Sequence, residues 1–198
     1  QAQGAASMVQ AVADKKLESL EEVHTFADGI AVKSPGNLSY EMVREYVDEL
    51  VTVSDDEIAA AILTLMEKQK IVSEGAGAVS VAAVLFNKLP LKGKKVVCII
   101  SGGNIDVNIL SRVISRGLLK TGRKASLTLS LLDKPGQLEE VSRIIAELGA
   151  NVTKVDHNMN VEDSDINGCY LTLRIETRDF KHIEEIKNRF RKEGFSLV

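Results

Sequence analysis

The chain has 198 residues, of which 44% are hydrophobic and 27% charged, and its formal net charge is −3. This balance is typical of a globular protein with a core of its own and excludes a disordered chain, a coiled coil and a collagen. No basic surplus favours a nucleic acid or an anionic membrane as a partner, and no apolar run is long enough to span a bilayer. Cys98 and Cys169 lie far apart in apolar runs, which indicates buried thiols in a reducing compartment, the cytoplasm.

Helical periods and turns alternate over the first part of the chain. Apolar spacing predicts a helix over residues 5–20 and a second one, capped by Ser39, over residues 39–49. The inner face of the second helix is expected to consist of four residues: Met42, Val43, Tyr46 and Val47. Residues 50–53 are expected to form a short strand.

Ser54 begins the clearest helix of this part. Its hydroxyl can cap the helix, Glu57 completes a capping box, and the helix should continue to about Gln69. Small residues then predict a closely packed helix over residues 77–86.

A nearly continuous apolar run over Lys95–Ile100 has the pattern of a parallel strand buried on both faces. It ends in Ser101-Gly102-Gly103-Asn104 and is followed by a helix over residues 106–119. Alternation of helix, strand and glycine-rich turn predicts an α/β fold, with Lys95–Ile100 among its best-ordered parts.

From Ala125 onward the pattern changes to that of a small separate domain. Alternating and helical periods predict the order β-α-β-β-α-β, the split βαβ arrangement of ferredoxin-like folds, with a polar loop over residues 159–168. The strands are expected over residues 125–132, 151–157, 169–176 and 195–198. They should form one antiparallel sheet with both helices on one face. The chain therefore divides into residues 1–121 and 122–198.

The turn that begins at Asp133 is the most informative stretch of the second domain. In the sequence DKPGQL, the helix after Gly136 starts with free N–H groups that attract a carboxylate, and Asp133 can accept a hydrogen bond from an ammonium group. These groups suit a free amino acid, although Pro135 and Gly136 also suit an ordinary strand-to-helix turn. A βαββαβ unit with the motif D-x-P-G-x-L resembles an ACT domain. The resemblance implies an amino-acid effector site at Asp133, Pro135, Gly136, Gln137 and Asn151.

The same resemblance implies a homodimer in which two such sheets lie side by side. A sheet covered on one side is also expected to leave apolar residues facing solvent, which would favour pairing. The effector could be isoleucine, valine or threonine, and the domain could equally serve assembly alone.

The loop Ser101-Gly102-Gly103-Asn104 lies at the carboxyl end of its expected strand, where open α/β sheets bind ligands. Its two glycines allow close approach of a flat or charged group, and they also suit a phosphate turn or a simple strand end. The surrounding segments are more specific. In order and spacing they resemble the C-terminal part of threonine ammonia-lyase with one ACT domain: TFADGIAVKSPG, VDELVTVSDDEI, SEGAGAVSVAAVL and KGKKVVCIISGGNIDVNILSRVISRGLLKTGR.

This resemblance implies part of a fold-type II pyridoxal-phosphate enzyme, which converts L-threonine to 2-oxobutanoate and ammonia in isoleucine biosynthesis. The loop residues Ser101, Gly102, Gly103 and Asn104 would bind the cofactor, with Ser101 at the pyridine nitrogen. Glu74 would lie near the face of the cofactor, or else be a solvated carboxylate at a helix start. Asp28 and Gly29 would lie at the margin of the active site, or else form a plain turn.

Two family motifs are not found in the sequence: the S-F-K-x-R-G-type motif of the Schiff-base lysine and the GGGG-type phosphate loop. The expectation is a C-terminal piece of the enzyme that is inactive and does not bind pyridoxal phosphate by itself, from a tetrameric, allosterically regulated parent. The alternative is an amino-acid-binding regulatory protein without catalysis.

His24, His157 and His182 have neither metal-ligand spacing nor a nearby cysteine nucleophile, so surface or packing roles are expected. Some relatives in the family carry a divalent-cation site that starts with a glutamate where this chain has Gln1. No metal site is therefore expected.

Overall fold

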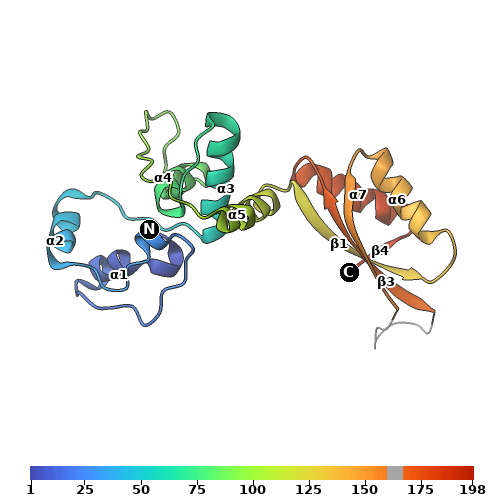
Figure 1. The fold of residues 1–198 in the computed structure, drawn as a ribbon, viewed down its shortest axis with the longest axis horizontal. Helices are drawn as coiled ribbons and strands as arrows, with labels where there is room; N and C mark the ends of the chain where they lie inside the picture. Colours follow the sequence, from blue (N-terminus) through green and yellow to red (C-terminus); the bar gives the residue numbers. More distant parts are fainter. Residues whose placement is uncertain (160–166) are drawn as a thin grey trace. The chain divides into compact units, whose positions relative to one another are not determined.

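The computed structural model describes residues 1–159 and 167–198, in two compact units, Gln1–Lys120 and Thr121–Val198 (Figure 1). Most of the polar loop expected over residues 159–168 lies outside the described residues. No helix in the described ranges combines the length and apolar character needed to cross a bilayer.

The first unit is built from helices around a buried central helix. Its elements are η1 (Gln3–Ala5), α1 (Ser7–Asp14), η2 (Asp28–Ile30), α2 (Asn37–Tyr46), α3 (Asp55–Thr64), η3 (Leu65–Gln69, a π-helical turn), α4 (Gly75–Leu85) and α5 (Val107–Lys120). Helix α3 packs against both α4 and α5, and residues 58–63 are all buried. This helix therefore forms the core of the unit.

The expected capping box at the start of α3 is confirmed. The Ser54 hydroxyl accepts a hydrogen bond from the Glu57 backbone at 3.3 Å, and the Glu57 carboxylate accepts one from the Ser54 backbone at 2.8 Å. The helical segment also continues to Gln69, as expected, although its last turn is π-helical.

Two expected helices differ from those observed. Helix α1 ends at Asp14, because Lys15 takes the left-handed conformation with φ of 55°. Helix α2 begins after Gly36 rather than at Ser39, and its expected inner face is wrong. Tyr40 is its buried residue, whereas the following side chains of that face are exposed: Met42, Tyr46 and Val47. A short amphipathic period does not reveal which side of a helix the rest of the unit covers.

The expected strands of the first unit are not formed. Residues 50–53 contribute one isolated parallel bridge, between Ala2 and Val53. The run Lys95–Ile100 forms neither helix nor strand and pairs with no strand among the described residues. Val97 is 91% exposed and Ile99 is 78% exposed, so the expectation of a strand buried on both faces is wrong. An apolar run becomes a parallel strand only where neighbouring strands satisfy its backbone groups.

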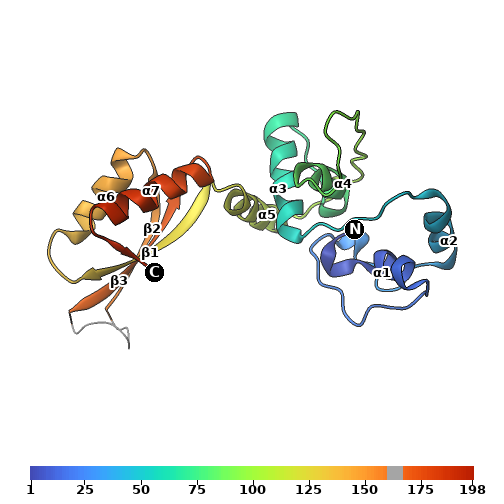
Figure 2. The ribbon, with the colours of Figure 1, turned by 180° about the vertical axis from the view of Figure 1, so that it is seen from behind.

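The second unit has the predicted order β-α-β-β-α-β. Its elements are β1 (Lys124–Leu132), α6 (Gln137–Glu147), β2 (Asn151–Asn158), β3 (Gly168–Glu176), α7 (Phe180–Lys192) and β4 (Ser196–Leu197). The strands form one antiparallel sheet in the order β2-β3-β1-β4, which confirms the single sheet expected from the sequence. Figures 1 and 2 show α6 and α7 together on one face of this sheet.

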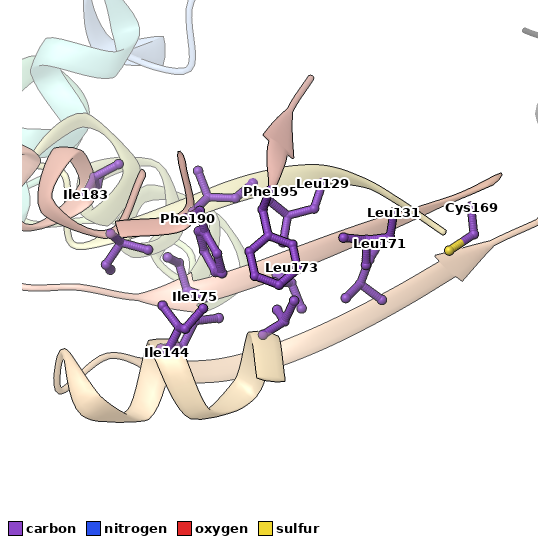
Figure 3. Close-up of a cluster of buried hydrophobic side chains, with 14 residues drawn as sticks. Leu129, Leu131, Ile144, Cys169, Leu171, Leu173, Ile175, Ile183, Phe190 and Phe195 are labelled. Carbon is purple, nitrogen blue, oxygen red and sulfur yellow. The ribbon is translucent and has the colours of Figure 1, made fainter. Parts of the chain in front are cut away.

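Alternate strand residues build the core on the helix-covered face. Leu127, Leu129 and Leu131 of β1 are buried with every second residue of β3 from Cys169 to Ile175. Helix residues complete the cluster, in which the Phe190 and Phe195 rings meet edge to face at 5.7 Å (Figure 3).

The opposite face of the sheet is mostly polar. Thr128 lies across from Thr172, with 3.0 Å between the two hydroxyl oxygens, and Ser130 lies across from Tyr170. The expectation that this face leaves a set of apolar residues exposed is therefore wrong, because the alternation of β1 places Leu127, Leu129 and Leu131 on the helix side. Leu132, at the end of the strand, is exposed.

Candidate functional site

The Ser101–Asn104 loop lies beside the N-terminus of α4. The backbone N–H of Glu74 donates a hydrogen bond to the Gly102 carbonyl at 3.3 Å, and the buried Ser73 hydroxyl lies 3.5 Å from the same oxygen. A β-carbon at Gly77 would collide with the Ser101 carbonyl and stand 2.6 Å from the Ser73 hydroxyl. Glycine at position 77 therefore allows the loop to lie directly on α4.

Glu74 brings two other sequence-predicted residues together. It is the N-cap residue of α4, yet its side chain makes no capping hydrogen bond. The carboxylate lies against the loop instead, since a β-carbon at Gly102 would stand 2.5 Å from Glu74 Cδ. A β-carbon at Gly29 would stand 3.4 Å from Glu74 Oε1. Three stretches that are distant in the sequence thus meet at one carboxylate.

The turn that contains Asp28 and Gly29 is held in place by an acid that the sequence analysis did not single out for this role. The Asp55 carboxylate accepts hydrogen bonds from the Thr25 hydroxyl at 2.6 Å and from the Phe26 backbone at 3.2 Å. The Asp28 carboxylate accepts a hydrogen bond from the Gly29 backbone at 2.9 Å, so it folds back on its own turn. Asp28 is exposed beside the site. Among the described residues, its carboxylate makes no hydrogen bond to Glu74 or to the Ser101–Asn104 loop.

A second candidate site lies in the other unit, at the turn between β1 and α6. A cavity of about 330 Å³ is lined by Asp133, Pro135, Gly136 and Gln137, together with neighbouring residues of the strand and the helix. Gly136 has φ of 89° and is the N-cap residue of α6, a conformation that favours glycine. The structure therefore brings together four of the five residues predicted for an effector.

The fifth residue, Asn151, lies outside this cavity. It begins β2, and its side-chain amide donates a hydrogen bond to Glu176 at 3.1 Å. His157, near the other end of β2, lines the cavity in its place.

Cys169 and His157 are the residues of this cavity that the sequence analysis missed. His157 Nε2 lies 4.0 Å from Asp133 Oδ1, and Cys169 is buried beside them. Burial, and to a lesser extent the Asp133 carboxylate, raise the pKa of the Cys169 thiol. The signal that could have found this group is strand register, because the three residues end or begin adjacent strands.

The other two histidines lie elsewhere. His24 is exposed and lies 2.7 Å from the Glu22 carboxylate. His182 is buried, accepts a hydrogen bond at Nδ1 from the Arg178 backbone and lies 2.9 Å from the Leu148 carbonyl through Nε2.

Comparison with known proteins gives close relatives over most of the chain. The L-threonine ammonia-lyase of Thermotoga maritima is 50% identical over 191 residues, which are 96% of this chain and 47% of that protein. The L-threonine ammonia-lyase of Geobacter sulfurreducens is 42% identical over 171 residues, 86% of this chain and 42% of that protein. The chain thus spans about half the length of the curated relatives it matches.

Two solved structures have a similar fold over part of the chain. The processed form of threonine deaminase isoform 2 from Solanum lycopersicum is 34% identical with a TM-score of 0.53, over 59% of this chain and 32% of that one. Maize serine racemase is 30% identical with a TM-score of 0.51, over 59% of this chain and 38% of that one. Residues 1–102, just over half of the chain, match the family described as pyridoxal-phosphate dependent enzyme, a family that uses pyridoxal 5′-phosphate. The chain belongs to this family of pyridoxal-phosphate dependent enzymes.

Proposed function

We propose that this chain contributes one wall of the cofactor site to a threonine ammonia-lyase, an enzyme that converts L-threonine to 2-oxobutanoate and ammonia. The observation that carries the proposal is the convergence of Gly29, Glu74 and the Ser101–Asn104 loop on one place in the first unit. The names of the relatives, L-threonine ammonia-lyase, support the same substrate and the same loss of ammonia.

The loop fits the ring-nitrogen end of pyridoxal phosphate. Ser101 is exposed, and within the described residues its hydroxyl has no hydrogen-bond partner. Gly77 leaves room beneath the Ser101 backbone, and Gly102 and Gly103 present no side chain above it. When bound, pyridoxal phosphate supplies the electron sink for elimination of the substrate's β-hydroxyl.

Ser101 would hold the cofactor ring by donating a neutral hydrogen bond to the pyridine nitrogen. A serine hydroxyl is too weak an acid to give its proton to that nitrogen, so Ser101 would orient the ring without protonating it. The Glu74 carboxylate lies at the N-terminus of α4, against the loop. In this proposal the Glu74 carboxylate accepts a proton beside the loop.

The chain alone should not turn over threonine, since its sequence has neither the family's lysine motif nor its glycine-rich phosphate loop. Adding pyridoxal phosphate to the 198-residue chain should produce no enzyme-bound cofactor absorbance and no 2-oxobutanoate. Appearance of both would contradict this part of the proposal.

The decisive test uses the complete gene product that carries this chain, assayed for 2-oxobutanoate with threonine and with serine. Ser101→Ala should lower kcat and weaken cofactor binding, whereas Ser39→Ala, on an exposed part of α2, should change neither. A complete protein that has no turnover with either substrate would overturn the proposal.

For the second unit we propose an ACT domain that binds a regulatory amino acid and pairs with a second copy, within a tetrameric cytoplasmic enzyme. The cavity at the β1–α6 turn supports the effector site, and the two free cysteines are consistent with a reducing compartment. The same cavity also favours the second candidate function, an amino-acid-binding regulator without catalysis. Amino-acid binding together with an inactive complete gene product would select that second candidate.

A further inference from the structure

Three side chains with metal-binding atoms meet at one end of the sheet in the second unit. Asp133 follows β1, Cys169 is the second residue of β3, and His157 is the penultimate residue of β2. Because the sheet order is β2-β3-β1, these positions lie on three adjacent strands.

Strand register places His157 and Cys169 on the same face, and Asp133 follows directly after the end of β1. Cys169 pairs with Leu131, two residues before Asp133, and His157 pairs with Leu171, two residues after Cys169. Side chains two residues apart in a strand point to the same side, here the side covered by the helices. Figure 3 shows Cys169 beside Leu131 and Leu171 at the end of the cluster away from Ile183.

The distances between the three groups are close to those of a metal site. One carboxylate oxygen, one imidazole nitrogen and the sulfur all lie within 4.8 Å of one another. Ligands of a tetrahedral zinc ion are separated by about 3.5 Å, which follows from bonds of about 2.0 Å to oxygen or nitrogen and about 2.3 Å to sulfur. The side chains of Asp133 and His157 are about half exposed, so both are free to rotate towards the buried sulfur. Such a rotation can shorten the distances between the three atoms to those of a zinc site.

We propose that Asp133, His157 and Cys169 bind one zinc ion, with a fourth position open to the cavity of about 330 Å³ that all three residues line. The donor set of carboxylate, imidazole and thiolate is one that zinc accepts. Binding forms the zinc–sulfur bond and releases the thiol proton to solvent. In the described part of the chain this is the one group of three potential ligands that lie so close together.

The proposal goes beyond the proposed function. It departs from the expectation of no metal site, which rested on Gln1 and on the spacing of the histidines along the sequence. The three residues are 24 and 12 positions apart, a spacing unlike that of the common zinc motifs, and the sheet brings them together. An amino-acid effector would use the same cavity, so metal binding is tested with no amino acid present.

The experiment uses the 198-residue chain after treatment with a chelator and removal of the chelator. Titration calorimetry with zinc chloride should give one equivalent, and cobalt(II) should give a sulfur-to-metal charge-transfer band in the near ultraviolet. Cys169→Ser should abolish the band. His157→Gln and Asp133→Asn should each weaken zinc binding by about tenfold or more, since even outer partners of metal ligands are worth about that much.

Matched controls are present in the first unit. Cys98→Ser and His24→Gln should leave the stoichiometry, the affinity and the cobalt band unchanged. Circular dichroism checks that each variant is folded, and the exposed position of His157 means that His157→Gln should disturb the core little. Failure to bind zinc, a cobalt band that survives Cys169→Ser, or unchanged affinity in folded His157→Gln would each overturn the proposal.

Discussion

The carboxylate of Glu74 lies against Gly102, and a β-carbon at position 102 would stand 2.5 Å from Glu74 Cδ and 2.9 Å from Oε2. Gly102 also has φ of 79°, a backbone conformation that side chains disfavour. Gly102, the first glycine of the Ser101–Asn104 loop, and Glu74 therefore depend on each other for their positions.

Gly102→Ala should loosen the contact between the loop and α4. The alanine would add about 1–2 kcal/mol of backbone strain and would also push the Glu74 carboxylate away. Hydrogen exchange followed by mass spectrometry should show faster exchange over residues 72–78. The control is Gly136→Ala, which has a similar φ of 89° but nothing within 4 Å of the new β-carbon. Unchanged exchange in Gly102→Ala would mean that the contact does not hold the loop.

The stability of the first unit should depend on the ionisation of Glu57. Burial by itself raises the pKa of this carboxyl. It is outweighed by hydrogen bonds from Lys88 at 2.9 Å and from the Ser54 backbone, and by the positive charges of Lys88 and Lys120. The pKa of Glu57 is therefore below its usual value. A carboxyl with a lower pKa in the folded state stabilises that state above its unfolded pKa of about 4.3. That contribution is lost as the pH falls through the folded pKa.

Glu57→Gln should therefore lower the free energy of unfolding by about 1–3 kcal/mol at neutral pH, and the difference from the wild type should shrink in acid. Urea unfolding at a series of pH values measures this. Glu184→Gln is the control, since Glu184 pairs with Lys187 on an exposed face and its loss should leave stability nearly unchanged. An equal loss at every pH would show that Glu57 acts through packing alone.

An amino-acid effector should raise the melting temperature of the second unit. A ligand at a hundredfold excess over its Kd stabilises the folded state by about 2.7 kcal/mol. Isoleucine, valine and threonine at millimolar concentration are the ligands to test, with a chelator present so that bound metal contributes nothing. Asp133→Ala should abolish the shift, and Asp156→Ala, which removes an exposed carboxylate of β2, should keep it. A full shift in Asp133→Ala would place the site away from this turn.

The apolar segment 95–100 should make the chain associate with itself. Val97 is 91% exposed and Ile99 is 78% exposed, and no described strand pairs with the segment. An exposed apolar segment without strand partners can pair with another chain. The double substitution Val97→Lys and Ile99→Lys should lower the sedimentation coefficient at high concentration. Val107→Lys, at a single exposed position of α5, should not, and a concentration-independent wild type would contradict the idea.

The second unit was predictable from sequence almost element by element. Each strand there finds its partners within the same 78 residues, from 121 to 198, so local periodicity and final structure agree. The segment 95–100 has an equally clear apolar pattern, yet no described strand pairs with it. The apolar pattern of a segment shows which of its side chains can be buried. Whether they are buried depends on the segments that pack against it.

The candidate sites divide in the same way. Ser101–Asn104, Glu74 and Gly29 were found through the resemblance of their segments to a known family, and the structure brings them together. His157 and Cys169 were missed, because only the register of three strands places them next to Asp133. Spacing along the sequence can reveal a site within one turn or one helix. It does not reveal a site whose residues come from different strands of a sheet.

The hydrophobic cluster of the second unit is composed entirely of residues from 125 to 197, and that of the first unit entirely of residues up to 113. The two clusters share no side chain. A recombination event between codons 120 and 121 would thus exchange either half of the chain while the hydrophobic core of the other half stays complete. This boundary is therefore a natural crossover point for chimaeras built in the laboratory.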